Sequence, residues 1–187
     1  MGKPWPKYKS RGTTTVKTPR RSRNIDKFNL KIRAMKFNED WKNQRIAMDF
    51  TLLDICRSSA YEGATDDNYT WFLSSPSHYF NARFALIQLV QLLPDGMNPS
   101  CIKITSGIRC PKVNAAVGGV KTSYHLHGLA LDIVSTAGPD VLKEVWKKAQ
   151  ENEDVSFYEV IWYRSRGFMH LAASYSDNIE TAFIVRK

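Results

Sequence analysis

One carboxylate inside an apolar segment constrains the fold of this chain more than any other feature. The run LALDIV has the composition of a buried β-strand and carries Asp132 within it. Burying an unpaired carboxylate costs several kcal/mol. The fold must therefore bring a partner to Asp132, which is either a hydrogen-bond donor such as a backbone N–H or an arginine, or a metal ion.

The histidines favour the metal. Three of the four in the chain, His125, His127 and His170, lie in or beside similarly apolar, strand-like segments. Catalytic zinc sites take three ligands from His, Asp and Glu and keep a fourth position for water. The three cysteines have no C-x-x-C spacing, so neither a cysteine zinc site nor a disulfide framework is indicated. A site of two histidines and Asp132 is thus a candidate, beside the plain hydrogen-bonded alternative.

The positive charge of the chain is confined to its first quarter. Residues 1–46 contain 14 Lys and Arg against three Asp and Glu, a net charge of +11, whereas residues 47–187 contain 13 against 15, a net charge of −2. Residues 1–24 have hardly any aliphatic side chains, so burial cannot offset the entropy of ordering them. We expect a basic N-terminal arm over 1–46, largely disordered at 1–24, followed by one folded domain over 47–187.

Periodicity after residue 47 predicts helices first and a sheet afterwards. Apolar residues at helical spacing predict helices that begin after an N-cap at Thr51 and that cover about 77–93 and 139–152. The strands that we expect cover about 101–107, 129–134, 155–163 and 167–174, with an edge strand at 180–187. This order predicts an α+β domain, a small antiparallel sheet with helices packed on it.

Two further expectations concern the helical part of the chain. The segment 64–77, ATDDNYTWFLSSPS, is rich in residues that break secondary structure, and we expect a loop there. In the helix over 77–93 we expect Phe80 on the apolar stripe and His78 at the surface or in a cap.

Three strings resemble a known family. ITSGIRCPKVNAAVGGVKTSYHLHGLALDI, FYEVIWY and GFMHLAAS are similar to the zinc D-alanyl-D-alanine carboxypeptidase family, which includes vancomycin-resistance D,D-peptidases and phage endolysins. The shared pattern is S-G-x-R-x-P-x-x-N, then G-G-x-x-x-S-x-H-x-x-G-x-A-x-D-I, then a later strand with a histidine. The resemblance covers about residues 50–174 and favours the phage-encoded stand-alone members. It implies a Hedgehog/DD-peptidase-like fold.

The resemblance also implies the site. By motif position, one zinc ion binds His125, Asp132 and His170. Arg109 lies at the same site, where a guanidinium holds a substrate carbonyl or carboxylate. Ser123 helps to bind the polar end of the substrate. The zinc activates a water molecule and polarises the scissile carbonyl, and a general base takes the proton.

The general base is where the chain departs from the family pattern. Relatives place a Glu, Asp or His two or three residues before the last ligand, and this chain has Phe168 and Gly167 there. If Tyr163 pairs with Phe168 across a four-residue loop, Glu159 falls on the same face as His170. We therefore predict Glu159 as the base, and the alternative is a carboxylate that faces solvent.

His127 and Cys110 have plainer interpretations. The family pattern leaves the position of His127 free, and we expect this side chain to contact substrate at the rim rather than the metal. Cys110 follows Arg109 and would be a candidate nucleophile, but a buried small side chain is the interpretation that we favour.

These features predict a zinc D,D-carboxypeptidase or murein endopeptidase that hydrolyses D-alanine-containing peptide bonds of peptidoglycan, in phage lysis or cell-wall processing. The alternative is a catalytically weak binding protein on the same fold whose basic arm contacts nucleic acid or another anionic polymer. No apolar segment follows the basic N-terminus and no run of 18 apolar residues occurs. We expect a monomer made in the host cytoplasm that acts on the cell wall after release.

Overall fold

The computed structural model describes residues 40–176 and 179–187. Residues 1–39 of the basic arm predicted over 1–46, including the disorder expected at 1–24, lie outside this part of the chain. None of the helices that the structure describes is long and apolar enough to cross a bilayer. The elements follow one another as 3₁₀ helix η1 (Trp41–Asn43), β1 (Arg45–Ala47), β2 (Phe50–Thr51), α2 (Leu52–Cys56), α3 (Ala64–Ser74), α4 (Pro76–Gln91), η2 (Pro99–Cys101), β3 (Ile102–Ser106), α5 (Pro111–Ala116), η3 (Tyr124–His127), β4 (Ala130–Ser135), α6 (Pro139–Glu151), β5 (Phe157–Tyr163), η4 (Arg164–Arg166), β6 (Phe168–Ala173) and β7 (Ala182–Arg186).

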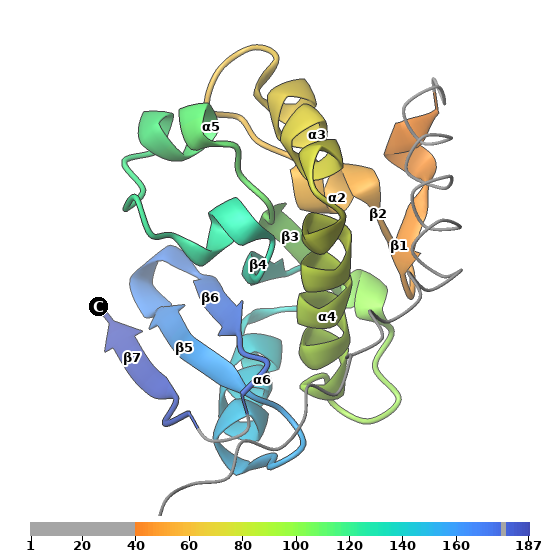
Figure 1. The fold of residues 1–187 in the computed structure, drawn as a ribbon. Coiled ribbons are helices and arrows are strands. Elements are labelled where there is room, and N and C mark those ends of the chain that lie inside the picture. Colours follow the sequence, from red (N-terminus) through yellow and green to blue (C-terminus); the bar gives the residue numbers. More distant parts are fainter. Residues whose placement is uncertain (1–39, 177–178) are drawn as a thin grey trace, which may run out of the picture.

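Five strands form the main sheet, in the order β3-β4-β6-β5-β7 (Figure 1). The pairs β3–β4, β4–β6 and β5–β6 are antiparallel, whereas the edge strand β7 runs parallel to β5. A separate two-stranded sheet pairs β1 with β2. The α+β class with a small, mainly antiparallel sheet is therefore confirmed.

The two faces of the sheet differ in chemistry. Leu131 and Ile133 of β4 lie opposite Leu171 and Met169 of β6, and all four pack into one hydrophobic cluster with residues of α4 and α6. Successive side chains of a strand point to opposite faces. Asp132, between the two buried residues of β4, therefore lies on the other face, which carries the polar site.

The predicted start of helix α2, with Thr51 as its N-cap, is confirmed. The Thr51 hydroxyl accepts a hydrogen bond from the Asp54 backbone N–H, and the Asp54 carboxylate accepts one from the Thr51 backbone N–H at 2.8 Å. This reciprocal capping box satisfies two donors that the first turn of α2 would otherwise leave free.

The loop predicted over residues 64–77 is wrong, because this segment contains helix α3. Its polar residues are fixed by tertiary contacts that local composition does not show. The buried Asn68 side chain donates to the Cys56 carbonyl at 3.0 Å and accepts from the Cys110 backbone N–H at 2.8 Å. Phe72 is fully buried. Packing therefore overrides the weak local preference for a loop.

The predicted apolar stripe of α4 is also wrong in detail. Phe80 is 52% exposed, whereas His78 is buried. The Nδ1 atom of His78 lies 2.8 Å from the Trp71 carbonyl oxygen of α3, so the ring has a polar partner inside the fold. Burial lowers the pKa of His78, which favours the neutral ring.

The folded body extends upstream of residue 47. Trp41 is buried and its ring stacks on Tyr69 of α3 with centroids 3.8 Å apart. Ile46 of β1 is part of the same core. The boundary expected between residues 46 and 47 therefore falls within a strand, and residues 41–46 pack with the domain.

Candidate metal centre

Adjacent strands place two of the predicted ligands side by side. Asp132 of β4 is paired directly with His170 of β6, so both side chains project from the same row of the sheet. The Nδ1 atom of His170 lies 2.7 Å from Oδ1 of Asp132.

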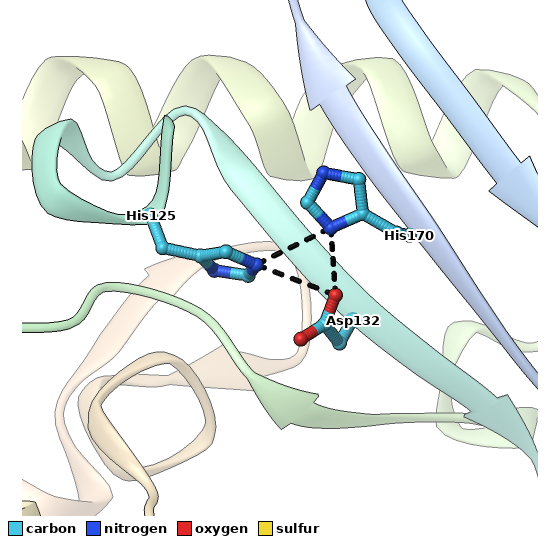
Figure 2. Close-up of side chains that lie close together, drawn as sticks. All are labelled: His125, Asp132 and His170. Atoms are coloured by element: carbon cyan, nitrogen blue, oxygen red, sulfur yellow. Dashed lines mark hydrogen bonds and ion pairs between the residues drawn. The ribbon is translucent and has the colours of Figure 1, made fainter. Parts of the chain in front are cut away.

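The third predicted ligand reaches the same point from the η3 turn. His125 is almost fully buried, and its Nε2 atom lies 3.3 Å from both Nδ1 of His170 and Oδ1 of Asp132 (Figure 2). The indole N–H of Trp71 donates to the Leu126 carbonyl at 2.8 Å and holds the turn. Gly128 ends the turn with φ of 74°, a conformation that favours glycine.

The neighbours of the two histidines decide which ring nitrogen of each can bind a metal. Nδ1 of His125 lies 2.5 Å from the carbonyl oxygen of Gly107, which can only accept, so Nδ1 carries the hydrogen and Nε2 a lone pair. On His170, Nε2 lies 3.4 Å from Oε1 of Glu159, a contact that keeps a proton on Nε2, so Nδ1 is the nitrogen that gives up its proton when a metal binds. A Cβ atom at Gly107 would lie 2.5 Å from the Ile55 carbonyl oxygen, so only glycine fits.

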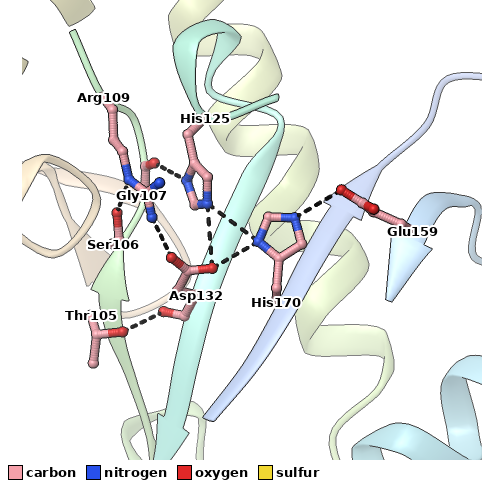
Figure 3. A network of polar contacts seen from close by, with 8 residues as sticks. All are labelled: Thr105, Ser106, Gly107, Arg109, His125, Asp132, Glu159 and His170. Carbon is pink, nitrogen blue, oxygen red and sulfur yellow. Dashed lines mark hydrogen bonds and ion pairs between the residues drawn. The ribbon is translucent and has the colours of Figure 1, made fainter. Parts of the chain in front are cut away.

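Arg109 holds the remaining oxygen of Asp132. Its guanidinium donates to Oδ2 of Asp132, and its Nε donates to the Ser106 hydroxyl at 2.7 Å (Figure 3). The Thr105 hydroxyl donates to the Asp132 backbone carbonyl at 3.1 Å. Asp132 thus has both carboxylate oxygens committed, Oδ2 to Arg109 and Oδ1 to the histidines.

The pKa values follow from this arrangement. Burial disfavours the charge of Asp132, but its contacts with His125 and His170 outweigh burial and hold its pKa well below the usual range. Burial lowers the pKa of His125. Burial opposes the charge of His170 too, yet hydrogen bonds to Asp132 and Glu159 dominate and raise its pKa to about 9.

The donor set fits a metal ion. Two nitrogen lone pairs and a carboxylate oxygen that face one another repel unless a proton or a cation lies among them. Two histidines and one carboxylate are a catalytic zinc ligand set, and tetrahedral bonds of about 2.0–2.1 Å separate ligand atoms by about 3.3 Å. The three atoms lie 2.7 to 3.3 Å apart. His125, Asp132 and His170 can therefore hold one zinc ion.

The three residues open into a cleft of about 430 Å³. The predicted site residues Arg109, Ser123 and Glu159 all line it. His127 does not line it: this residue is exposed, and its backbone carbonyl accepts a hydrogen bond from Asn81 of α4 at 2.8 Å. The cleft is lined by Arg109, Val120, Ser123, His125, Asp132, Glu159, Ile161, Tyr163, Arg166, Phe168 and His170.

The strand register expected around the base is confirmed. Tyr163 pairs with Phe168 and Ile161 with His170, so Glu159 lies on the cleft face beside the last ligand. Phe168 and Gly167 cannot accept a proton, because a phenyl ring has no basic atom and glycine has no side chain. The Phe168 ring stacks on Tyr163 with centroids 4.3 Å apart.

Cys110 has a structural role as the N-cap of α5. It is buried, and its Sγ accepts a hydrogen bond from the Val113 backbone N–H at 3.4 Å, as the N-cap of α5. Sequence reasoning missed Tyr163 and Arg166 as cleft residues, because a hairpin loop gives no periodic signal and its side chains are placed by the fold.

Comparison with known families gives a match over most of the folded part of the chain. The family described as Peptidase M15 matches residues 49–172. The match spans all three candidate ligands, Arg109 and Glu159. No curated protein matches the chain.

Proposed function

The chain belongs to the peptidase M15 family, and on this premise we propose that it is a zinc-dependent hydrolase of D-alanine-containing peptide bonds in peptidoglycan. The observation that carries the proposal is the convergence of His125 Nε2, Asp132 Oδ1 and His170 Nδ1 within 3.3 Å in a cleft. The family supports a zinc metallopeptidase, and the donor set fits zinc.

Zinc bound here supplies a Lewis acid that polarises the scissile carbonyl and makes a water molecule acidic enough to attack at neutral pH. The residues around it hold the ligands in place. Gly107 fixes the tautomer of His125, and Arg109 fixes the rotamer of Asp132. Partners of this kind keep ligand atoms aimed at one point and raise metal affinity.

Glu159 accepts the proton of the attacking water in this proposal. Among the described residues that line the cleft, Asp132 and Glu159 are the carboxylates, and both oxygens of Asp132 are committed. A hydrogen bond to His170 lowers the pKa of Glu159, so the group is ionised and able to accept at neutral pH. The Glu159 carboxylate thus orients the ligand His170 and also faces the substrate.

Ser123 and Arg109 form the polar wall for the substrate. The Ser123 hydroxyl lies in the cleft and can donate to a substrate carbonyl. The Arg109 guanidinium is mostly buried against Asp132, with 14% of its side chain exposed, so its main task here is to hold Asp132 while its exposed edge meets the substrate.

The basic N-terminal segment suits an anionic partner. Its net charge of +11 over residues 1–46 favours contact with wall polymers or nucleic acid through phosphate groups. We propose that this segment localises the hydrolase on an anionic polymer, in lysis or wall processing, while residues 47–187 carry the chemistry.

The experiment that tests this function is mass spectrometry of the products released from purified peptidoglycan, with and without a chelator. Release of D-alanine or of peptides from cross-links is expected, with loss of activity on chelation and recovery on adding zinc. Asp132→Ala should be inactive. Products that appear equally in the presence of the chelator, or from Asp132→Ala, would overturn the assignment.

A further inference from the structure

Another pocket lies across the sheet from the metal centre. Its volume is about 510 Å³, slightly more than that of the metal cleft, and we call it the α6 pocket. Trp162 of β5 lines this pocket, whereas the next residue, Tyr163, lines the metal cleft. Successive side chains of a strand point to opposite faces, so the β5–β6 hairpin separates the two sites. The residues of the α6 pocket that matter below are Ser135, Asp140, Lys143, Trp162, Arg164 and Gly167.

The Trp162 ring forms a rigid apolar wall of the α6 pocket. Trp162 is half-buried, and the ring of Trp146 of α6 lies beside it with centroids 5.9 Å apart. Trp146 in turn meets the ring of Phe183 of β7 edge to face, with centroids 5.6 Å apart. All three rings pack against the hydrophobic core. The wall is therefore fixed before a ligand arrives, as it is in most small-molecule sites.

Three charged side chains surround this wall, and none of them is neutralised by a neighbour. Asp140 and Lys143 of α6 and Arg164 of η4 are exposed and line the pocket. Within residues 40–176 and 179–187, no ion pair or side-chain hydrogen bond joins any of the three to another residue. The Cζ atom of Arg164 lies 5.6 Å from the centroid of the Trp162 ring, which restrains the guanidinium without neutralising it. The pocket thus offers one carboxylate acceptor and two cationic donors.

This mixture of charges restricts the kind of ligand that fits. An anion would be attracted by Lys143 and Arg164 but repelled by Asp140, which neighbours Lys143 on the helix surface. A cation would be repelled by two of the three groups. A wholly apolar ligand would desolvate all three charges without replacing their hydrogen bonds to water. A neutral ligand with hydroxyl groups at its edge and an apolar face satisfies the charged groups and packs on Trp162. The pyranose ring of a sugar has this form.

The η4 turn connects the α6 pocket with the metal cleft. Arg164 of this turn lines the pocket, and Arg166 lines the cleft. The row of Phe168, where β6 begins, lies two residues from the row of His170, or about 6.6–6.8 Å along the strands. About four residues of extended peptide span up to about 14 Å. A stem peptide of that length can cross the turn, with its scissile bond at the metal ligands and its sugar in the pocket.

We propose that the α6 pocket binds an acetamido sugar of the glycan strand whose stem peptide is cleaved at the metal centre. The inference rests on the proposed hydrolase function and names its substrate class: stem peptides that are still attached to glycan, in preference to free peptides. Asp140 accepts hydrogen bonds from the sugar hydroxyls, and Lys143 and Arg164 donate to hydroxyl and acetamido oxygens. Trp162 packs against the C–H face of the ring.

The first test compares a disaccharide pentapeptide with the same pentapeptide without its sugar. The zinc-loaded wild type should have an about tenfold lower KM for the substrate that carries the sugar. Arg164→Gln and Asp140→Asn should each lower this preference, the ratio of the two KM values, to about two or less. A wild type without the preference, or variants that retain it in full, would overturn the proposal.

Two lysines of α6 provide a matched pair of variants. Lys143 and Lys147 are both exposed and lie one turn apart, but Lys147 does not line the pocket. Lys143→Gln should lower the preference for the sugar-bearing substrate, and Lys147→Gln should keep the wild-type ratio of KM values. An equal fall in both variants would indicate a general effect of charge on this helix and would refute the site.

Binding of a sugar without any peptide gives a readout that does not depend on hydrolysis. Di-N-acetylchitobiose, a neutral acetamido disaccharide, is titrated into the zinc-loaded full chain while NMR follows the indole N–H signal of Trp162, assigned with Trp162→Phe. The signal should shift with a Kd of about 1 mM. Arg164→Gln should raise this Kd by about fivefold or more, and Lys147→Gln should leave it unchanged. Inorganic phosphate is titrated as a second probe.

The outcomes separate this inference from the proposed function. If the disaccharide shifts the Trp162 signal but no peptide is cleaved, the sugar site stands and the hydrolase function fails. If both pentapeptides are cleaved equally well and the signal does not shift, the hydrolase stands and the sugar site is refuted. A shift with phosphate and none with the disaccharide would make the pocket an anion site and would also overturn the proposal.

Discussion

Glu159→Gln separates the two tasks that the structure gives to one carboxylate. Oε1 of Glu159 lies 3.4 Å from Nε2 of His170, and the residue also lines the cleft. Glutamine keeps the size of the side chain and an oxygen that accepts from Nε2, but it cannot take a proton. Positioning of His170 should be largely retained, and proton transfer should be lost.

The magnitudes differ enough to be measured. Loss of a proton acceptor costs about 10²–10⁴ in rate, whereas loss of a carboxylate that orients a metal ligand costs about 10–100-fold in metal affinity. We expect Glu159→Gln to lower kcat at saturating zinc by about 100-fold or more and to weaken zinc binding by less than about tenfold. Glu159→Ala should lose both properties.

The assay is release of D-alanine at saturating zinc, with zinc affinity measured separately by competition against a chelating indicator. The control is Glu153→Gln, the same substitution at an exposed residue that precedes β5. It should leave both the rate of D-alanine release and the zinc affinity unchanged. If Glu159→Gln keeps activity within about threefold of the wild type, another group takes the proton and the assignment of Glu159 is refuted.

Three further results are expected. Gly107→Ala should destabilise the protein by about 1–3 kcal/mol in urea unfolding, because its Cβ would lie 2.5 Å from the Ile55 carbonyl oxygen; unchanged stability would contradict this close approach. Zinc affinity should fall about tenfold between about pH 8 and about pH 7, since zinc must displace a proton from His170, whose pKa is raised to about 9; an affinity that is flat over this range would show that no proton is released. Deleting residues 1–24 should leave zinc content unchanged while weakening binding to an anionic polymer such as DNA or teichoic acid, and loss of zinc on deletion would place these residues in the site.

Much of the sheet was predictable from local pattern. The runs that became β4, β5 and β6 are apolar and bounded by breakers, and the four residues between Tyr163 and Phe168 set the register that puts Glu159 beside His170. The parallel pairing of β7 with β5 was not predictable, since a run of alternating residues does not state its partner. Helix α3 was missed because its polar side chains bond to distant backbone groups.

Some residues of the site could be predicted from the sequence, and others could not. The motif located His125, Asp132 and His170, because ligands of a metal cannot be exchanged for other residue types without loss of the metal. It did not predict the position of His127 correctly. This residue belongs to the 3₁₀ turn η3 and does not line the cleft. It also gave no indication of Arg166, which the η4 turn places in the lining of the cleft.

The zinc content of the purified protein and of Asp132→Ala tests the central claim most directly. Both proteins are loaded with zinc, freed of excess metal and assayed for metal and for folding by circular dichroism. The account predicts about one zinc per chain in the wild type and a large loss in a folded Asp132→Ala. A wild-type protein without zinc, or an Asp132→Ala variant that holds zinc as tightly as the wild type, would contradict it.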